Sequence, residues 1–270
     1  MQYQKFALFS DLDGTLFSSD RTVSLENRSA LERFVAGGGL FGIATGRAPR
    51  NALKLLPGVP INTWSVVLNG TEAFDYRTDA VALSRSLSQL RMAAFLREVL
   101  DTWPQVNVLV CSESSLYFLS APASQNRDFF DSHQPCQAAT LEMVLQYPWL
   151  KCLLCAPRPI LERLEEYAVQ TGVTETADRV YTAVDYLEFL PKGVHKGRCL
   201  EDLRRMGELA GRTIVAVGDW TNDVELLQAA DVAVAPANAL PEIKALCDYV
   251  TVSNNDNAIA AVIDEILPRL

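Results

Sequence analysis

Two carboxylates, Asp11 and Asp13, directly follow the apolar run Phe6-Ala7-Leu8-Phe9 and precede a glycine. Such a run is typical of a buried strand, and a spacing of two lets both acids converge where the strand ends. In an open parallel sheet, ligands bind at the carboxyl ends of the strands. Two crowded carboxylates repel each other unless a cation or a proton separates them. The pattern therefore predicts a metal, a nucleophile beside a general acid, or both, although a simple Asp-Gly turn has the same residues.

Three further polar clusters lie at strand ends or in loops. They are Thr45-Gly46-Arg47, the loop 191–197 with Lys196, and the loop 218–223 with Asp219, Asn222 and Asp223. Because parallel strands share one carboxyl edge, we expect these clusters to meet.

The residue types of the four clusters suit a phosphate ester held beside Mg²⁺. A few hard carboxylate oxygens that leave open positions are typical magnesium ligands. Hydroxyl, ammonium and backbone N–H groups are donors fit for phosphoryl oxygens. The expected oxygen ligands are Asp11, Asp13 and Asp219, and the expected donors are Thr45, Lys196 and the backbone near Gly14 and Gly46.

Other chemistries find little support in the sequence. The glycines at 37, 39 and 42 fit a dinucleotide fingerprint, but they close a predicted helix rather than open one. No Walker-type loop and no Ser–His–Asp set is visible, and we interpret His133 and His195 as ordinary histidines.

The bulk composition predicts a globular chain with ample core. Its 270 residues are 49% hydrophobic and carry a net charge of −9, which offers no general attraction to nucleic acid. No signal pattern and no membrane-length apolar run is visible, so we expect a cytoplasmic protein with reduced cysteines. Cys152 and Cys155 are predicted to be buried structural thiols.

Strand and helix patterns alternate at both ends of the chain, which predicts a parallel α/β sheet. A helix is expected after Ser24, which can cap it, and a short helix before Leu56. Expected strands cover residues 6–11, 40–45, 64–68, 213–217, 231–235 and 248–252, and expected later helices cover 224–230 and 258–267.

The middle of the chain has the pattern of an α+β domain with antiparallel pairing. It combines helices at 87–100 and 160–171 with a hairpin of strands 106–111 and 116–119 and paired strands within 179–190. We therefore expect a core formed by residues 1–81 and 188–270, interrupted by an inserted domain at 82–187.

The four clusters together resemble the motifs of the haloacid dehalogenase (HAD) superfamily of phosphohydrolases, Cof-like branch. The resembling segments, in order, are Asp-Leu-Asp-Gly-Thr-Leu, Ala-Thr-Gly-Arg, Pro-x-Gly-x-x-Lys-Gly and Gly-Asp-x-x-Asn-Asp. The resemblance covers nearly the whole chain. It implies a Rossmann-like core with an inserted type-IIB cap.

The resemblance also implies a mechanism. Asp11 would attack phosphorus and form an aspartyl-phosphate, and an ordinary Asp pKa of about 3.9 would leave it ionised at neutral pH. Asp13 would serve as general acid and then as base. Mg²⁺ would be held by the Asp11 carboxylate, the Asp13 backbone carbonyl and Asp219, with Asp223 acting through water.

The remaining motif residues are assigned to the phosphoryl group by the same resemblance. Thr45, Gly46 and Asn222 would hold or orient it, and Lys196 would offset its charge and that of Asp11. Arg47 would either reach the substrate or brace the cap.

Two positions depart from the family pattern, namely Trp220, where small residues are frequent, and His195. The substrate class implied is a small phosphorylated metabolite, such as a sugar phosphate or a phosphorylated cofactor like pyridoxal phosphate, and neither nucleic acid nor a membrane. The alternatives are a phosphosugar mutase of similar fold and a catalytically silent phosphometabolite-binding protein. Arg127 and Arg158 are weak candidates for a second anionic group, and the sequence does not predict the oligomeric state.

Overall fold

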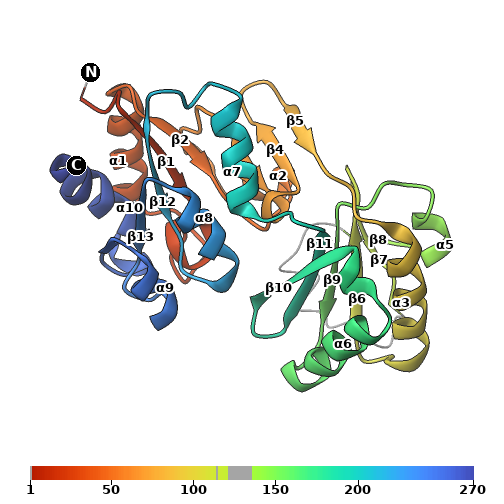
Figure 1. Cartoon of the computed structure of the whole chain (residues 1–270). Coiled ribbons are helices and arrows are strands. Elements are labelled where there is room, and N and C mark those ends of the chain that lie inside the picture. Colours follow the sequence, from red (N-terminus) through yellow and green to blue (C-terminus); the bar gives the residue numbers. More distant parts are fainter. Residues whose placement is uncertain (1, 114, 121–135) are drawn as a thin grey trace. The chain divides into compact units, whose positions relative to one another are not determined.

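The structure, a computed structural model, describes residues 2–113, 115–120 and 136–270. The chain divides into a core unit, Met1–Leu83 with His195–Leu270, and an inserted unit, Ser84–Val194 (Figure 1). The boundary expected after residue 187 falls inside strand β11 (Tyr186–Pro191). Since β11 pairs with β10 (Ala177–Ala183) as far as Pro191, the whole strand belongs to the inserted unit.

The core unit is built on a five-stranded sheet in the order β14-β13-β12-β1-β2, and every neighbouring pair is parallel. Its strands are fully or largely buried, as expected where helices cover both faces. Their bounds are Phe6–Ser10 for β1, Leu40–Ile43 for β2, Thr213–Val217 for β12, Val232–Ala235 for β13 and Tyr249–Val250 for β14.

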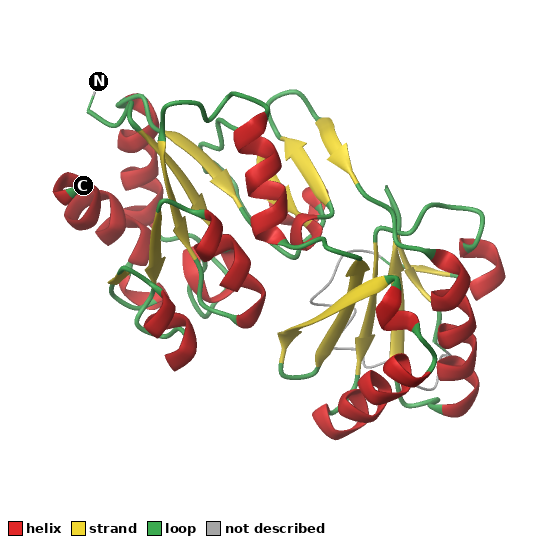
Figure 2. Cartoon of the chain, in the orientation of Figure 1, coloured by secondary structure: helices red, strands yellow, loops and turns green. Residues whose placement is uncertain are grey.

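Helices cover both faces of this sheet, so the core unit has three layers (Figures 1 and 2). Apolar side chains of α1 and α10 pack on one face, and those of α7, α8 and α9 on the other. The Ser24 hydroxyl caps α1 by accepting the backbone N–H of Asn27, as its sequence position predicts. The helix bounds are Leu25–Ala36 for α1, Pro49–Lys54 for α2, Lys196–Arg205 for α7, Val224–Ala229 for α8, Pro241–Leu246 for α9 and Ala258–Ala261 for α10.

The strand expected at 64–68 joins the parallel sheet at one point only. A single parallel bridge connects Ala44 to Val66, and β3 (Ser65–Val67) otherwise pairs antiparallel with β4 (Glu72–Asp75) in a small sheet that also contains β5 (Ala80–Ser84). The prediction of a further parallel ladder was wrong here, because the chain reverses at residues 68–70 and β3 pairs along its length with β4.

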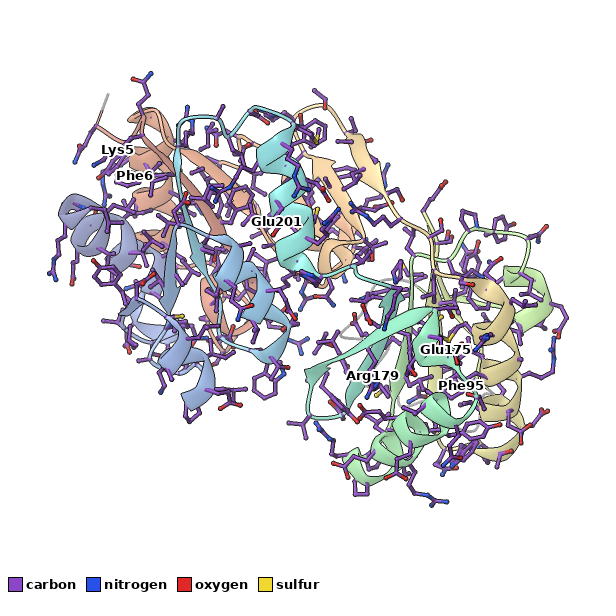
Figure 3. The ribbon with its side chains drawn as sticks, in the orientation of Figure 1. Lys5, Phe6, Phe95, Glu175, Arg179 and Glu201 are labelled. Atoms are coloured by element: carbon purple, nitrogen blue, oxygen red, sulfur yellow. The ribbon has the colours of Figure 1, made fainter. Side chains whose placement is uncertain are left out.

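The inserted unit contains a six-stranded sheet in the order β10-β11-β9-β6-β7-β8, antiparallel except between β7 and β8. Phe95 of α3, labelled in Figure 3, lies in this unit. Its ring packs against those of Tyr167 of α6 and Phe189 of β11. The remaining bounds are Asn107–Cys111 for β6, Leu116–Phe118 for β7, Gln137–Ala138 for β8, Lys151–Cys155 for β9, Gln89–Thr102 for α3, Leu141–Val144 for α5 and Arg158–Gln170 for α6.

The cysteine pair of β9 is structural. Cys152 and Cys155 are buried with free thiols, and burial raises the pKa of Cys155 to about 12, so the thiolate needed for metal binding or redox chemistry is disfavoured. In the part of the chain that the structure describes, no helix combines the length and apolarity that a membrane crossing requires.

Candidate active site

The register of the core sheet brings three of the four polar clusters to one edge. Ser10 is the partner of both Ile43 and Val217, so the residues that follow these three strand ends leave the sheet side by side. The first cluster begins at Asp11, the second reaches Thr45 after β2, and the fourth reaches Asp219 after β12. The arrangement is that of a ligand site at the carboxyl edge of a parallel sheet.

The third cluster enters the same site through Lys196, the first residue of α7. Its ammonium group donates to Oδ1 of Asp11 at 2.7 Å and to Oδ1 of Asp223 at 2.6 Å. Lys196 and Asp223 are fully buried, and Asp11 is 7% exposed. Burying three charged groups costs desolvation energy that apolar side chains in the same positions would not cost. A triad kept despite this cost is a candidate for a functional site.

Asp219 is fixed from two sides. Its Oδ1 accepts the Thr15 hydroxyl at 2.6 Å, and its backbone N–H donates to Oδ2 of Asp223 at 3.0 Å. Gly14 lies directly against it, with a φ of +79° that favours glycine. A Cβ at position 14 would collide with the Asp219 carboxylate, so a glycine is required for the close approach.

Burial is the largest influence on the pKa values of Asp11 and Asp219. It raises the pKa of Asp11 well above the usual range, opposed by the charge of Lys196 and reinforced by the neighbouring carboxylates. It also raises the pKa of Asp219 to about 7, reinforced by the charge of Asp223. The ordinary pKa expected for Asp11 is therefore wrong, because that expectation ignored burial. A divalent cation beside the two groups would lower both pKa values again.

Lys196 stays charged in this environment. Burial alone would lower its pKa, but the carboxylates of Asp11 and Asp223 outweigh burial and raise the pKa above its ordinary value. The site thus keeps one permanent cation between two acids.

Asp13 has a different partner from its neighbour two positions earlier. The Arg47 guanidinium donates from Nε to Oδ2 of Asp13 at 2.7 Å and from Nη2 to Oδ1 at 2.6 Å. The Asp13 side chain is 49% exposed, whereas the Arg47 side chain is 14% exposed. The Thr45 hydroxyl, which is buried, accepts the backbone N–H of Arg47 at 3.1 Å and fixes the start of this loop.

Three carboxylates could hold a metal ion, since Asp11, Asp219 and Asp223 each offer an oxygen within 4.8 Å of the others. Hydrogen bonds use both oxygens of Asp223, from Lys196 and from the backbone N–H groups of Asp219 and Trp220. Oδ2 of Asp11 and Oδ2 of Asp219 accept no hydrogen bond from any residue that the structure describes. The donor set therefore fits a hard cation bound directly by Asp11 and Asp219, with Asp223 orienting its neighbours.

The haloacid dehalogenase-like hydrolase model matches residues 8–263, which is nearly the whole chain. The chain belongs to this family. The assignment to HAD hydrolases made from the four motifs is thereby confirmed, as is the α/β fold class.

Several relatives of this HAD enzyme are named phosphatases. Phosphatase YwpJ of Bacillus subtilis is 26% identical over 95% of this chain and 98% of its own length. The 5-amino-6-(5-phospho-D-ribitylamino)uracil phosphatase YwtE of the same organism is 25% identical over 95% of this chain and 96% of its own. The solved structure of the HAD subclass IIB sugar phosphatase BT4131 superposes with a TM-score of 0.81 at 22% identity, over 96% of this chain and 98% of that one.

Several contacts of the HAD site were not predicted. Thr15 binds Asp219, and the side-chain amide of Asn238 donates to the carbonyl of Gly14 at 2.8 Å. Asn222 donates to Oδ1 of Asn69 at 3.0 Å. Thr15 stands inside the first motif, so its position was a usable signal, whereas Asn69 and Asn238 lie far from their partners in sequence.

The remaining candidates have local roles or lie elsewhere. His195 caps α7 by accepting the N–H of Arg198, and the indole N–H of Trp220 is buried without a hydrogen-bond partner in the described part of the chain. Arg158, in the inserted unit, pairs with Glu162 at 3.1 Å and stacks on the ring of Tyr181. Arg127 and His133 lie outside the described residues.

Proposed function

We propose that this HAD phosphatase hydrolyses phosphomonoesters of small metabolites, with Asp11 as the nucleophile. The observation that carries the proposal is the buried Lys196 ammonium between Asp11 and Asp223 at the carboxyl edge of the sheet. A fixed, desolvated cation in this place is suited to offset the charge of an attacking carboxylate and of phosphoryl oxygens.

Mg²⁺ is the cofactor that fits the site. The Asp11 and Asp219 carboxylates and the Asp13 backbone carbonyl would hold it, with Asp223 acting through water. When bound, Mg²⁺ would neutralise phosphoryl charge and favour the ionised form of both carboxylates.

The reaction would proceed in two displacements. The Asp11 carboxylate attacks phosphorus and forms an aspartyl-phosphate, while the bond from phosphorus to the ester oxygen breaks and Asp13 gives that oxygen a proton. Asp13 then takes a proton from water, whose oxygen attacks phosphorus and releases inorganic phosphate with the original Asp11 carboxylate.

The second cluster and Asn222 would hold the phosphoryl group. Thr45, Gly46 and Asn222 offer hydrogen-bond donors at the site. Arg47 holds Asp13 by two hydrogen bonds, and an arriving phosphate dianion competes for that guanidinium. Exchange of Arg47 from Asp13 to the phosphate would release Asp13 for proton transfer.

The substrate class proposed is a sugar phosphate or a phosphorylated cofactor such as pyridoxal phosphate. The names of two similar proteins, a sugar phosphatase and a 5-amino-6-(5-phospho-D-ribitylamino)uracil phosphatase, support a small phosphorylated metabolite. A net charge of −9 gives no support to nucleic acid as substrate.

Phosphate release from p-nitrophenyl phosphate and from a panel of metabolite phosphates, with and without Mg²⁺, tests this proposal. We expect Mg²⁺-dependent release of inorganic phosphate by the wild type and none by Asp11→Asn, with an unchanged circular dichroism spectrum. An isomerised sugar phosphate as product would identify a mutase instead. Binding of phosphate without any turnover would identify a silent binding protein, and either result would refute the hydrolase proposal.

A further inference from the structure

Three consecutive residues after β3 have left-handed backbone conformations. The φ angles are +51° at Leu68, +56° at Asn69 and +94° at Gly70. Only glycine adopts such angles freely, and a leucine there is rare. All three residues are buried, with Asn69 1% exposed. A strained, buried segment persists only where the surrounding structure holds it, and such segments concentrate at functional sites.

The backbone of this segment holds the second motif. The N–H of Leu68 donates to the carbonyl of Arg47 at 3.1 Å, and the N–H of Asn69 donates to the carbonyl of Thr45 at 3.0 Å. The amide of Asn69 also packs directly on Gly46, since a Cβ built there would lie 3.0 Å from Nδ2 and 3.1 Å from Oδ1. Asn69 therefore covers the loop whose donors the proposed function assigns to the phosphoryl group.

The other side of the segment borders the third and fourth motifs. A Cβ at Gly70 would collide with the carbonyl of His195, immediately before Lys196. The side-chain amide of Asn222 donates to Oδ1 of Asn69 at 3.0 Å, across 153 positions of sequence. Asn69 is thus hydrogen-bonded to both the second and the fourth motif.

We propose that Asn69 is a positioning residue of the phosphoryl site, which orients the Asn222 amide and the Gly46 backbone for the phosphoryl group. The inference rests on the proposed function. The left-handed φ of Asn69 explains why an asparagine occupies this position, because asparagine tolerates that conformation and still provides an acceptor for Asn222. Replacement by glycine keeps the backbone conformation and removes the side-chain amide, so the contribution of the amide can be measured apart from that of the backbone.

The test is a double-mutant cycle with Asn69→Gly and Asn222→Ala. We measure kcat and KM for p-nitrophenyl phosphate with Mg²⁺, the inhibition constant of inorganic phosphate, and thermal unfolding. Asn257→Gly is the matched control, because Asn257 also has a left-handed φ of +68° and lies at the N-terminus of α10 rather than at the site. A lost hydrogen bond between neutral groups predicts roughly a 3- to 10-fold lower kcat/KM for Asn69→Gly. A comparable rise in the phosphate inhibition constant is expected, and Asn257→Gly should keep both values.

Positioning through Asn222 further predicts that Asn69→Gly has a smaller effect once Asn222 is alanine, and the contact of the Asn69 amide with Gly46 accounts for the effect that remains. If the two losses multiply instead, or if Asn69→Gly lowers only the unfolding temperature, the inference is overturned. Should the wild type lack turnover but bind inorganic phosphate in calorimetry, the hydrolase proposal fails. Weaker phosphate binding by Asn69→Gly would then still support the positioning role, and unchanged binding would overturn it. A wild type that neither turns over nor binds phosphate overturns both.

Discussion

Replacement of Asp219 by asparagine separates the cost of burying this carboxylate from its use as a metal ligand. The side chain is 8% exposed, and burial raises its pKa from 3.8 to about 7. Asparagine has nearly the same shape, cannot ionise and keeps the oxygen that accepts the Thr15 hydroxyl. The change therefore removes charge with little change in packing.

The sign of the effect follows from linkage. Because the folded-state pKa lies above the unfolded value, the favourable contribution of Asp219 is present below about pH 4 and is lost as the pH rises through about 7. A rise of about three pH units corresponds to about 4 kcal/mol. In EDTA, we expect Asp219→Asn to be more stable than wild type by up to about 4 kcal/mol at pH 8, with the difference vanishing toward pH 4.

Mg²⁺ should narrow this difference in stability at pH 8. Mg²⁺ at a hundred times its dissociation constant stabilises the folded state by about 2.7 kcal/mol. Only a protein that keeps the Asp219 carboxylate as a metal ligand gains this stabilisation. We therefore expect Mg²⁺ to stabilise the wild type at pH 8 and to leave Asp219→Asn nearly unchanged.

Urea unfolding followed by circular dichroism from pH 4 to 8, in EDTA and in Mg²⁺, measures both effects. Asp264→Asn is the control, because Asp264 forms a largely exposed ion pair with Arg33 outside the site. Parallel pH profiles of wild type and Asp219→Asn in EDTA would refute the burial argument. Equal stabilisation of the two proteins by Mg²⁺ would refute the role of Asp219 as a ligand.

Three further substitutions test the packing around the site and in the inserted unit. Lys196→Met should abolish phosphate release and lower the free energy of unfolding by about 3 kcal/mol, because it leaves buried carboxylates without their cation; unchanged turnover would contradict this. Gly14→Ala should weaken Mg²⁺ binding, measured by calorimetry, at least tenfold, since its Cβ collides with Asp219; wild-type affinity would show that the loop adapts. Lys151→Met should destabilise the protein to urea by about 3 kcal/mol by leaving Glu188 buried without its 2.8 Å partner, and adding Glu188→Leu should recover most of the loss. A double variant no more stable than the single one would contradict that account.

Local sequence signals predicted the elements that carry the motifs. An apolar run ending in Asp11 is sufficient to predict β1 and its polar end, and Ser24 marks the start of α1 because its hydroxyl caps the first turn. The expected meeting of Thr45 and Asp219 near Asp11 depended on the parallel topology, which the alternation of strands and helices indicates.

What the sequence did not predict depends on contacts between distant residues. The antiparallel pairing of β3 is decided by β4, and the Asn69–Asn222 hydrogen bond joins segments 153 positions apart. The raised pKa values of Asp11 and Asp219 follow from burial in three dimensions, which an ordinary reference pKa cannot include. In each case the missing information was the packing partner, not the residue type.

Trapping of the phosphorylated enzyme tests the central claim most directly. Wild-type protein is incubated with Mg²⁺ and a radiolabelled phosphomonoester, quenched in acid, digested and mapped by mass spectrometry. The account predicts a label that hydroxylamine removes, as expected of an acyl phosphate, on the peptide that contains Asp11, and no label in Asp11→Asn. A label on another residue, or turnover by Asp11→Asn at the wild-type rate, would contradict it.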